Sequence, residues 1–257
     1  MPVARQTFSR RDGRPKLHPK PRKLRGPKKI FAMSLRIEDY AMIGNAHTVA
    51  LVGNNGSIDW LCIPRFDSGA CFAALLGNPA NGHWQIAPNA TVQSVRRRYS
   101  GPTLILENEF VTESGAVVVI DFMPVARLAQ RTDIVRIVRG LRGAVPMRMD
   151  LTVRFDYGHI VPWITRYDHT IRAIAGPDAL ELKTPVPLHV RNLATVSEFT
   201  IASGQSIPFT LTWYPSHDGP PSETTPASCW VRPKHGGWSG HRVARSRDHG
   251  ATWRCGR

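Results

Sequence analysis

The sequence has no long apolar run and only four cysteines among its 257 residues. No stretch approaches the roughly 20 apolar residues of a membrane-spanning helix, and the basic start precedes no apolar segment of a secretory signal. The cysteines form neither a CxxC pair nor a Cys/His ligand spacing; they are Cys62, Cys71, Cys229 and Cys255. We therefore expect buried, reduced thiols, no metal or other cofactor, no membrane association and a cytoplasmic protein.

Acidic residues are scarce at the two ends of the chain, and this scarcity accounts for the formal net charge of +15. Residues 1–32 carry a charge of +10 and residues 226–257 carry +6, whereas residues 33–225 carry −1. Basic residues spread over a folded surface would indicate a polyanionic partner. Because the charge is confined to the ends, we do not expect the central domain to bind nucleic acid.

The first 32 residues differ in composition from the rest. The run RPKLHPKPRKLRGPKK (14–29) is rich in Pro and Lys, while residues 33–225 contain one lysine, Lys183. Such a segment buries too little apolar surface to offset its chain entropy, so we expect it to be disordered. Three interpretations remain open: translation that starts at Met33, a solvated tail without a role, or an arm that binds nucleic acid or acidic membrane.

The C-terminal part lacks the residue types from which cores are built. No Leu, Ile, Phe or Met occurs from residue 215 to the end, although three Trp and many Arg, Gly and His do. We therefore expect residues 226–257 to form an irregular segment. Two explanations remain open: a frameshift or truncation of the gene, or a genuine divergent tail.

Between residues 48 and 214 the pattern is that of an all-β protein. Short alternating apolar runs are separated about every ten residues by Gly, Asn, Asp, Ser or Pro, which is typical of an antiparallel β-sandwich. In one such run the apolar residues alternate with polar ones, which predicts one buried and one solvated face. These apolar residues are Met147, Met149, Leu151 and Val153.

Turn residues between these runs predict five hairpins. The one helical candidate is residues 68–76, which Asp67 or Ser68 would cap and Gly77 would end. We therefore predict a sandwich of about a dozen strands with one short helix, over residues 33–225. The five predicted turns lie at residues 54–56, 113–115, 141–145, 176–177 and 203–205.

The most distinctive stretch is GSIDWLCIPRFDS, residues 56–68, between IEDYAMIGNAHTVALVGNN (37–55) and GACFAALLGNPANGHWQIAP (69–88). Together with RFDYG at 154–158, these residues resemble the N-terminal domain of glycoside hydrolase family 15, which holds bacterial glucoamylase-like and trehalase-like enzymes. The resemblance covers residues 37–214. It implies a β-sandwich that the family follows with a helical (α/α)6 catalytic barrel. It also implies that the intact enzyme hydrolyses an α-glucoside, such as trehalose or a maltooligosaccharide, with inversion.

The family's catalytic glutamates lie in that barrel, so the resemblance places no catalytic residue in this chain. Glu107 and Glu109 point to one face of a predicted strand, about 6.5 to 7 Å apart, which is the right scale for glycoside hydrolysis. Solvent-facing strands commonly carry such pairs, so we interpret them as non-catalytic. Asp121 and Asp156 stand at predicted strand ends and are interpreted as turn caps. Four histidines show no metal-ligand spacing: His47, His83, His159 and His169.

Five residues of the motif are candidates for substrate binding or domain docking: Asp59, Trp60, Arg65, Phe66 and Asp67. Carbohydrate sites combine an aromatic platform with hydrogen bonds from Arg and carboxylates, so direct contact with a saccharide is one interpretation. A second is docking against the catalytic barrel. A third is structural, with Trp60 in the core and Arg65 paired with Asp67 or Asp59.

Three functional hypotheses follow. The first is a non-catalytic domain of a family 15 glycosidase that is inactive alone and has the catalytic barrel as its partner. The second is a free-standing carbohydrate-binding module with α-glucosides as ligands. The third is a nucleic-acid-associated protein that uses its basic N-terminal tail.

Overall fold

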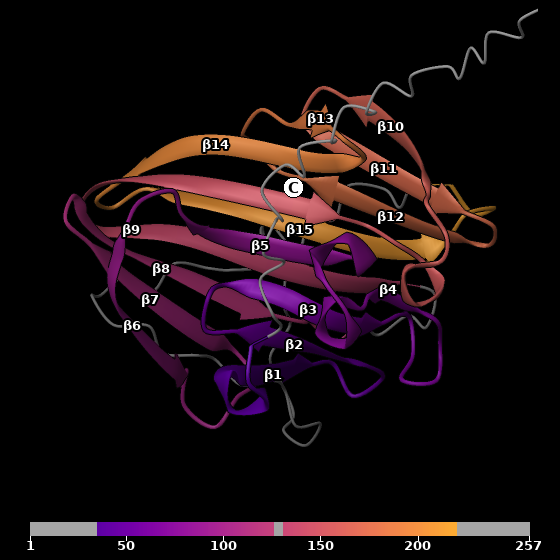
Figure 1. The fold of residues 1–257 in the computed structure, drawn as a ribbon, viewed down its shortest axis with the longest axis horizontal. Coiled ribbons are helices and arrows are strands. Elements are labelled where there is room, and N and C mark those ends of the chain that lie inside the picture. The colour runs from indigo at the N-terminus through magenta and orange to yellow at the C-terminus, as the bar shows by residue number, and fades with distance from the viewer. Residues whose placement is uncertain (1–34, 126–130, 220–257) are drawn as a thin grey trace, which may run out of the picture. The chain divides into compact units, whose positions relative to one another are not determined.

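The computed structural model describes residues 35–125 and 131–219, and these residues form an all-β fold. Fifteen strands occur in this part of the chain, and the named strand pairs are antiparallel. The expected antiparallel β-sandwich of about a dozen strands is confirmed. Its strands form two layers, called here sheet A and sheet B (Figure 1).

Sheet A has the strand order β1-β2-β3-β5-β9-β14-β13, and the short strand β4 pairs with the end of β3. The motif at residues 56–68 supplies β3 and the loop after it. The bounds are β1 (Tyr40–Gly44), β2 (Val49–Gly53), β3 (Ser57–Cys62), β4 (Ala70–Phe72), β5 (His83–Pro88), β9 (Thr132–Thr152), β13 (His189–Arg191) and β14 (Ala194–Ala202).

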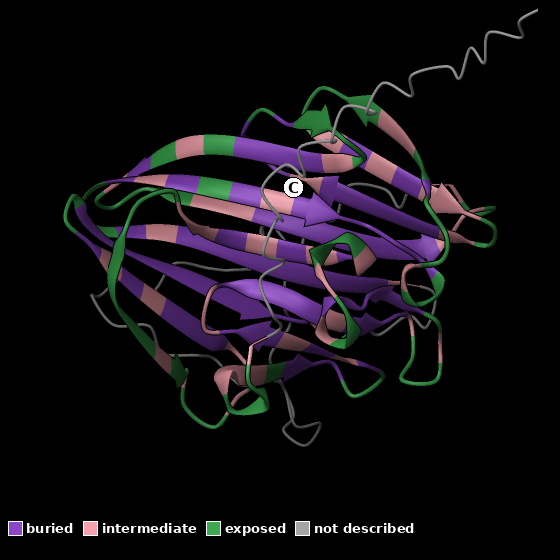
Figure 2. Cartoon of the chain, viewed as in Figure 1, coloured by how far each residue is buried: buried purple, intermediate pink, exposed green. Residues whose placement is uncertain are grey.

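Sheet B has the strand order β6-β7-β8-β9-β15-β12-β11-β10, so β9 is shared with sheet A. The edge strand β6 is exposed along most of its length (Figure 2). The bounds are β6 (Val92–Tyr99), β7 (Leu106–Thr112), β8 (Gly115–Phe122), β10 (Trp163–Tyr167), β11 (Thr170–Ala175), β12 (Asp178–Lys183) and β15 (Ser206–Pro215).

The long strand β9 carries the chain from one sheet into the other. Its first half pairs with β8 and β15 in sheet B, and its second half pairs with β5 and β14 in sheet A. The consecutive strands β14 and β15 run antiparallel beside β9 through the same bend. The hairpins predicted at 141–145 and 203–205 are therefore wrong. In both places the chain passes from sheet to sheet without reversing.

Two glycines explain why turn-like sequences form a corner here. A Cβ on Gly140 would lie 2.1 Å from the carbonyl oxygen of Ala202. A Cβ on Gly143, whose φ is +67°, would lie 2.1 Å from the carbonyl oxygen of Ser114. The missing side chains allow neighbouring backbones to approach closely, and this lets paired strands bend together.

The other three predicted hairpins are confirmed. The turns at 54–56, 113–115 and 176–177 join β2 to β3, β7 to β8 and β11 to β12. Each contains a glycine with positive φ, namely Gly56, Gly115 and Gly176. Local turn chemistry therefore identified those hairpins in which the two strands pair directly with each other.

The main core lies between the two sheets and takes alternate residues from each strand. The four apolar residues predicted to face inward are all buried in it: Met147, Met149, Leu151 and Val153. Strand β8 is buried on both faces, because a second cluster lies on the outer face of sheet B. This second cluster contains Val118, Ile120, Phe122, Val135 and Ile137.

The helix predicted at residues 68–76 is not formed. This segment contains β4 and the 3-10 turn η2 (Ala74–Leu76), and the other turns are η1 (Ile37–Asp39), η3 (Pro79–Asn81) and η4 (Asp156–Gly158). All three residues of β4 are fully buried, so no solvated helix face remains. The predicted caps also have other partners: Asp67 binds Arg65, and the Ser68 hydroxyl accepts from the Arg65 N–H.

The cysteine prediction is confirmed where the structure describes the chain, because Cys62 and Cys71 are free and buried. Among the same residues, no helix is long and apolar enough to cross a membrane. The other two cysteines, the segment 1–32 and the segment 226–257 lie outside the described residues.

Candidate functional site

A β-bulge in β3 turns two of the candidate residues outward. Leu51 of β2 faces Trp60 and Val52 faces Ile58, so Asp59 is the extra residue. Ile58 and Leu61 point into the main core, while Trp60 packs on the other side of sheet A with Cys62 and Ala70. A bulge of this kind redirects side chains. It places Asp59 and Trp60 together on the outer face of sheet A.

The Asp59 carboxylate is buried and fully engaged by hydrogen bonds. The Tyr40 hydroxyl donates to Oδ2 at 2.7 Å, and the Ser57 hydroxyl donates to Oδ1 at 2.5 Å. Burial, followed by the hydrogen bond to Asp59, raises the pKa of Tyr40 well above its ordinary value. With both oxygens hydrogen-bonded, Asp59 joins β1 to β3.

Trp60 packs against the turn η4, which lies far from it along the chain. Its ring lies 6.0 Å from the ring of Tyr157, at an interplanar angle of 43°. Burial raises the pKa of the Cys62 thiol, which is hydrogen-bonded to the Tyr157 side chain. Trp60 does not lie in the main core but packs against the small cluster of Cys62, Ala70 and Ala73 on the outer face of sheet A.

The loop after β3 presents the other three candidates to solvent. It begins at a cis Ile63–Pro64 peptide. Arg65 donates to both oxygens of Asp67, from Nε at 2.9 Å and from Nη2 at 3.1 Å. This bond raises the pKa of Arg65 and lowers that of Asp67. Phe66 lies between the charged pair and is 58% exposed.

Further exposed apolar side chains lie at the same end of the two sheets as this loop. The loop contacts the turn η4, because a Cβ added at Gly69 of the loop would lie 3.8 Å from the Cα of Asp156 in η4. The described chain also leaves the sandwich at this end, where Ser216 bonds to the β11-β12 turn (Figure 1). We call the exposed apolar residues here the loop-end patch: Phe66, Tyr157, Ile160, Val161 and Trp163.

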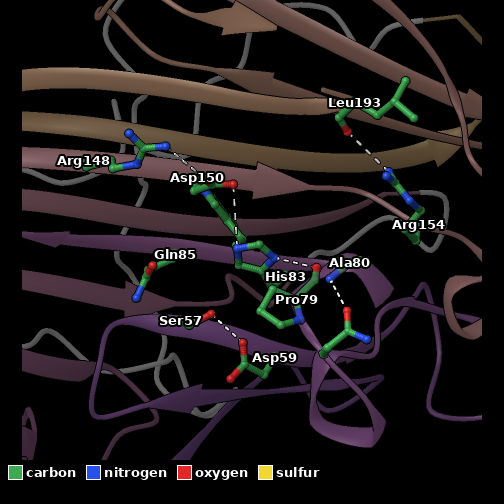
Figure 3. A network of polar contacts seen from close by, with 12 residues as sticks. Ser57, Asp59, Pro79, Ala80, His83, Gln85, Arg148, Asp150, Arg154 and Leu193 are labelled. Carbon is green, nitrogen blue, oxygen red and sulfur yellow. Dashed lines mark hydrogen bonds and ion pairs between the residues drawn. The ribbon is translucent and has the colours of Figure 1, made fainter. Parts of the chain in front are cut away.

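A polar network crosses the outer face of sheet A beside Asp59, and the sequence analysis did not identify it (Figure 3). Strand register brings Ser57, Gln85 and Asp150 into one row across β3, β5 and β9. His83 Nδ1 donates to the Pro79 carbonyl at 2.9 Å, and its Nε2 lies 3.7 Å from Asp150 Oδ1. Because Asp150 lies more than 60 positions after His83 and Gln85 along the chain, only the register shows that they are neighbours.

The glutamate pair is not arranged as a catalytic site. Glu107 is buried and accepts from Arg98 Nε at 2.7 Å, whereas Glu109 is half-buried. Asp121 is not a turn cap, because it forms a fully buried ion pair with Arg136. Asp156 begins the turn η4, where its carbonyl accepts from His159. No group of three His, Cys, Asp or Glu residues in the described ranges is arranged to hold a metal ion.

Comparison with known proteins identifies the domain. The model of the family "Trehalase-like, N-terminal" matches residues 30–197. A trehalase of Mycolicibacterium smegmatis is 28% identical over 202 residues, which cover 69% of this chain and 30% of that protein. Trehalase 1 of Sulfolobus acidocaldarius is 34% identical over 155 residues, covering 60% and 26%. A Thermoplasma volcanium trehalase is 29% identical over 158 residues, covering 60% and 25%.

The chain thus spans less than a third of the length of these curated relatives. The matched part contains the bulged strand β3, the loop that follows it and the outer face of sheet A. By this match the chain belongs to the trehalase-like N-terminal domain family.

Proposed function

We propose that this chain is the non-catalytic domain of a glycosidase of glycoside hydrolase family 15, and that it hydrolyses no α-glucoside on its own. The chain's similarity to trehalases over less than a third of their length supports this proposal. So does the state of Glu107, whose carboxylate is bound to Arg98 and buried. The free thiols Cys62 and Cys71 favour a reducing, cytoplasmic setting.

The proposed role is to brace a catalytic barrel through the loop-end patch. The observation that carries this role is the clustering of exposed apolar side chains where the described chain leaves the sandwich. Trp163 is 75% exposed, Phe66 58% and Val161 50%. Apolar clusters of this kind mark protein interaction sites, and the last described strand ends on the same side of the sandwich.

The experiment is a calorimetric titration of the full chain with the part of the Mycolicibacterium smegmatis trehalase that lies outside the match. We expect saturable binding that weakens at least tenfold in Trp163→Ser and Phe66→Ser. Leu141→Ser is the matched control, because Leu141 is also exposed but lies at the corner opposite the patch. Equal binding by all three variants, or no binding at all, would refute docking through this patch.

A further inference from the structure

Arg154 has an unusual environment for an arginine. It is only 8% exposed, and among the described residues it has no carboxylate partner. Its Nη1 donates to the carbonyls of Val153 at 2.7 Å and Leu193 at 3.4 Å. Burial lowers its pKa. A buried guanidinium that bonds only to carbonyl oxygens keeps N–H donors free for another acceptor.

The surroundings of Arg154 are the polar face of sheet A. Val153 points into the core, so Arg154 lies on the same face of the chain as Asp150. It also stands beside β5, where a Cβ on Gly82 would lie 3.4 Å from Arg154 Cβ. His83 follows Gly82 and pairs in register with Thr152. Arg154, His83 and Asp150 therefore line one stretch of this face (Figure 3).

The facing atoms of His83 and Asp150 are not hydrogen-bonded to each other. His83 Nδ1 must donate its proton to the Pro79 carbonyl, so in the neutral ring Nε2 is an acceptor. It faces the Asp150 carboxylate at 3.7 Å, which is too long for a hydrogen bond. Each of these two acceptors can take a hydrogen bond from a hydroxyl group of a ligand.

Neighbouring side chains complete a surface of mixed donors and acceptors. Arg148 joins Glu198 at 2.8 Å and Asp150 at 3.4 Å. Gln85 donates to the Asn55 carbonyl at 3.2 Å, which leaves its side-chain oxygen as an acceptor. Positive and negative side chains alternate, so this face suits a neutral ligand better than a polyanion.

Part of this face is buried, although it points away from the core. Thr152, Arg154 and Val196 expose between 6% and 8% of their surface. The turn η3 stands on one side, through the Pro79–His83 bond, and the β13-β14 hairpin stands on the other, through the Arg154–Leu193 bond. Polar groups that several strands bring to one face can bind a small ligand.

We propose that this polar face of sheet A, around Arg154, binds a neutral saccharide. Arg154 donates to sugar oxygens, and Asp150, His83 and the Gln85 side-chain oxygen accept from sugar hydroxyls. This site is separate from the loop-end patch, so the proposal of saccharide binding does not depend on the proposal of docking.

The test is calorimetry of the full chain with trehalose and with maltotriose, and with inorganic phosphate as the anionic probe. We expect saturable binding of a saccharide, weakened at least tenfold in Arg154→Gln and in Asp150→Asn. Arg36→Gln is the matched control, because Arg36 is exposed and pairs with Glu38. Arg154→Gln should unfold at the same temperature as the parent or higher, because it removes a buried charge that has no carboxylate partner.

Four results would overturn the proposal. The first is the absence of saccharide binding, and the second is saccharide binding that persists in both Arg154→Gln and Asp150→Asn. The third is phosphate binding that exceeds saccharide binding and depends on Arg154. The fourth is a loss of affinity in Arg154→Gln for the catalytic part of a trehalase relative alone, which would make this face a protein interface. Asp150→Asn keeps the test decisive if Arg154→Gln does not fold.

Discussion

Arg136 and Asp121 form an ion pair that is completely enclosed between the two sheets. Arg136 Nε lies 2.8 Å from Asp121 Oδ1, and both side chains are 0% exposed. The two strands β8 and β9 place them directly opposite each other. Arg136 also donates to the carbonyls of Trp84 and Gly56 in sheet A, at 2.6 and 2.7 Å. One guanidinium thus ties the two layers together.

Removing one partner of this pair should strongly destabilise the domain. Arg136→Met leaves the Asp121 carboxylate and two carbonyls without donors in the core. We expect a loss of about 3 to 5 kcal/mol in the free energy of unfolding, measured by urea denaturation. The double variant Asp121→Leu/Arg136→Met should be more stable than Arg136→Met alone, because it leaves no buried charge uncompensated. An Arg136→Met variant as stable as the parent would contradict this account of the pair.

The corner between the sheets should depend on Gly143. Gly143→Ala combines a left-handed backbone with a Cβ only 2.1 Å from the Ser114 carbonyl oxygen. Gly176→Ala is the matched control, because Gly176 also has positive φ, at +57°, but nothing lies within 4 Å of its Cβ position. We expect Gly176→Ala to cost about 1 to 2 kcal/mol and Gly143→Ala clearly more. Equal melting temperatures for the two variants would show that the corner tolerates a side chain.

Tyr40 should make the domain less stable in alkali. Its pKa is raised in the folded state by burial and by Asp59, so the folded form holds the phenol proton more tightly than the unfolded chain. This contribution is complete below the unfolded pKa of about 10 and declines as the pH rises above it toward the folded pKa. Near pH 7, Tyr40→Phe should lose about 1 kcal/mol for the missing hydrogen bond.

The stability difference between the parent and Tyr40→Phe should therefore shrink from pH 10 to pH 11. Urea denaturation at several pH values measures it, with exposed Tyr167→Phe as the control for the loss of one phenol. A difference that stays constant over this range would show that the raised pKa of Tyr40 has no part in alkaline stability.

Local sequence signals were sufficient where the paired segments adjoin. The turn residues at 54–56 and 176–177 lie between strands that pair with each other, so their chemistry predicted the hairpins correctly. At 141–145 and 203–205 the same residue types serve a bend. The segments on the two sides of each bend do not pair with each other. Ala144 of β9, for example, pairs with Ala202 of β14. A turn-like composition does not reveal which strand is the partner.

The candidate site shows the same division. The motif at 56–68 was recognisable as a continuous stretch, and the Arg65–Asp67 pair within it was one of the interpretations drawn from sequence. The bulge that turns Trp60 outward depends on pairing with β2, and the neighbours of Arg154 come from β5, β9 and the β13-β14 hairpin. Such contacts arise from register between distant strands, which residue patterns along one strand do not specify.

Release of glucose from trehalose by the purified 257-residue chain is the most direct test of the account. A non-catalytic domain should release no more glucose than a buffer blank, and Glu107→Gln should give the same result. Turnover above the blank that disappears in Glu107→Gln or Glu109→Gln would contradict the central claim, because it would place a working carboxylate within this domain.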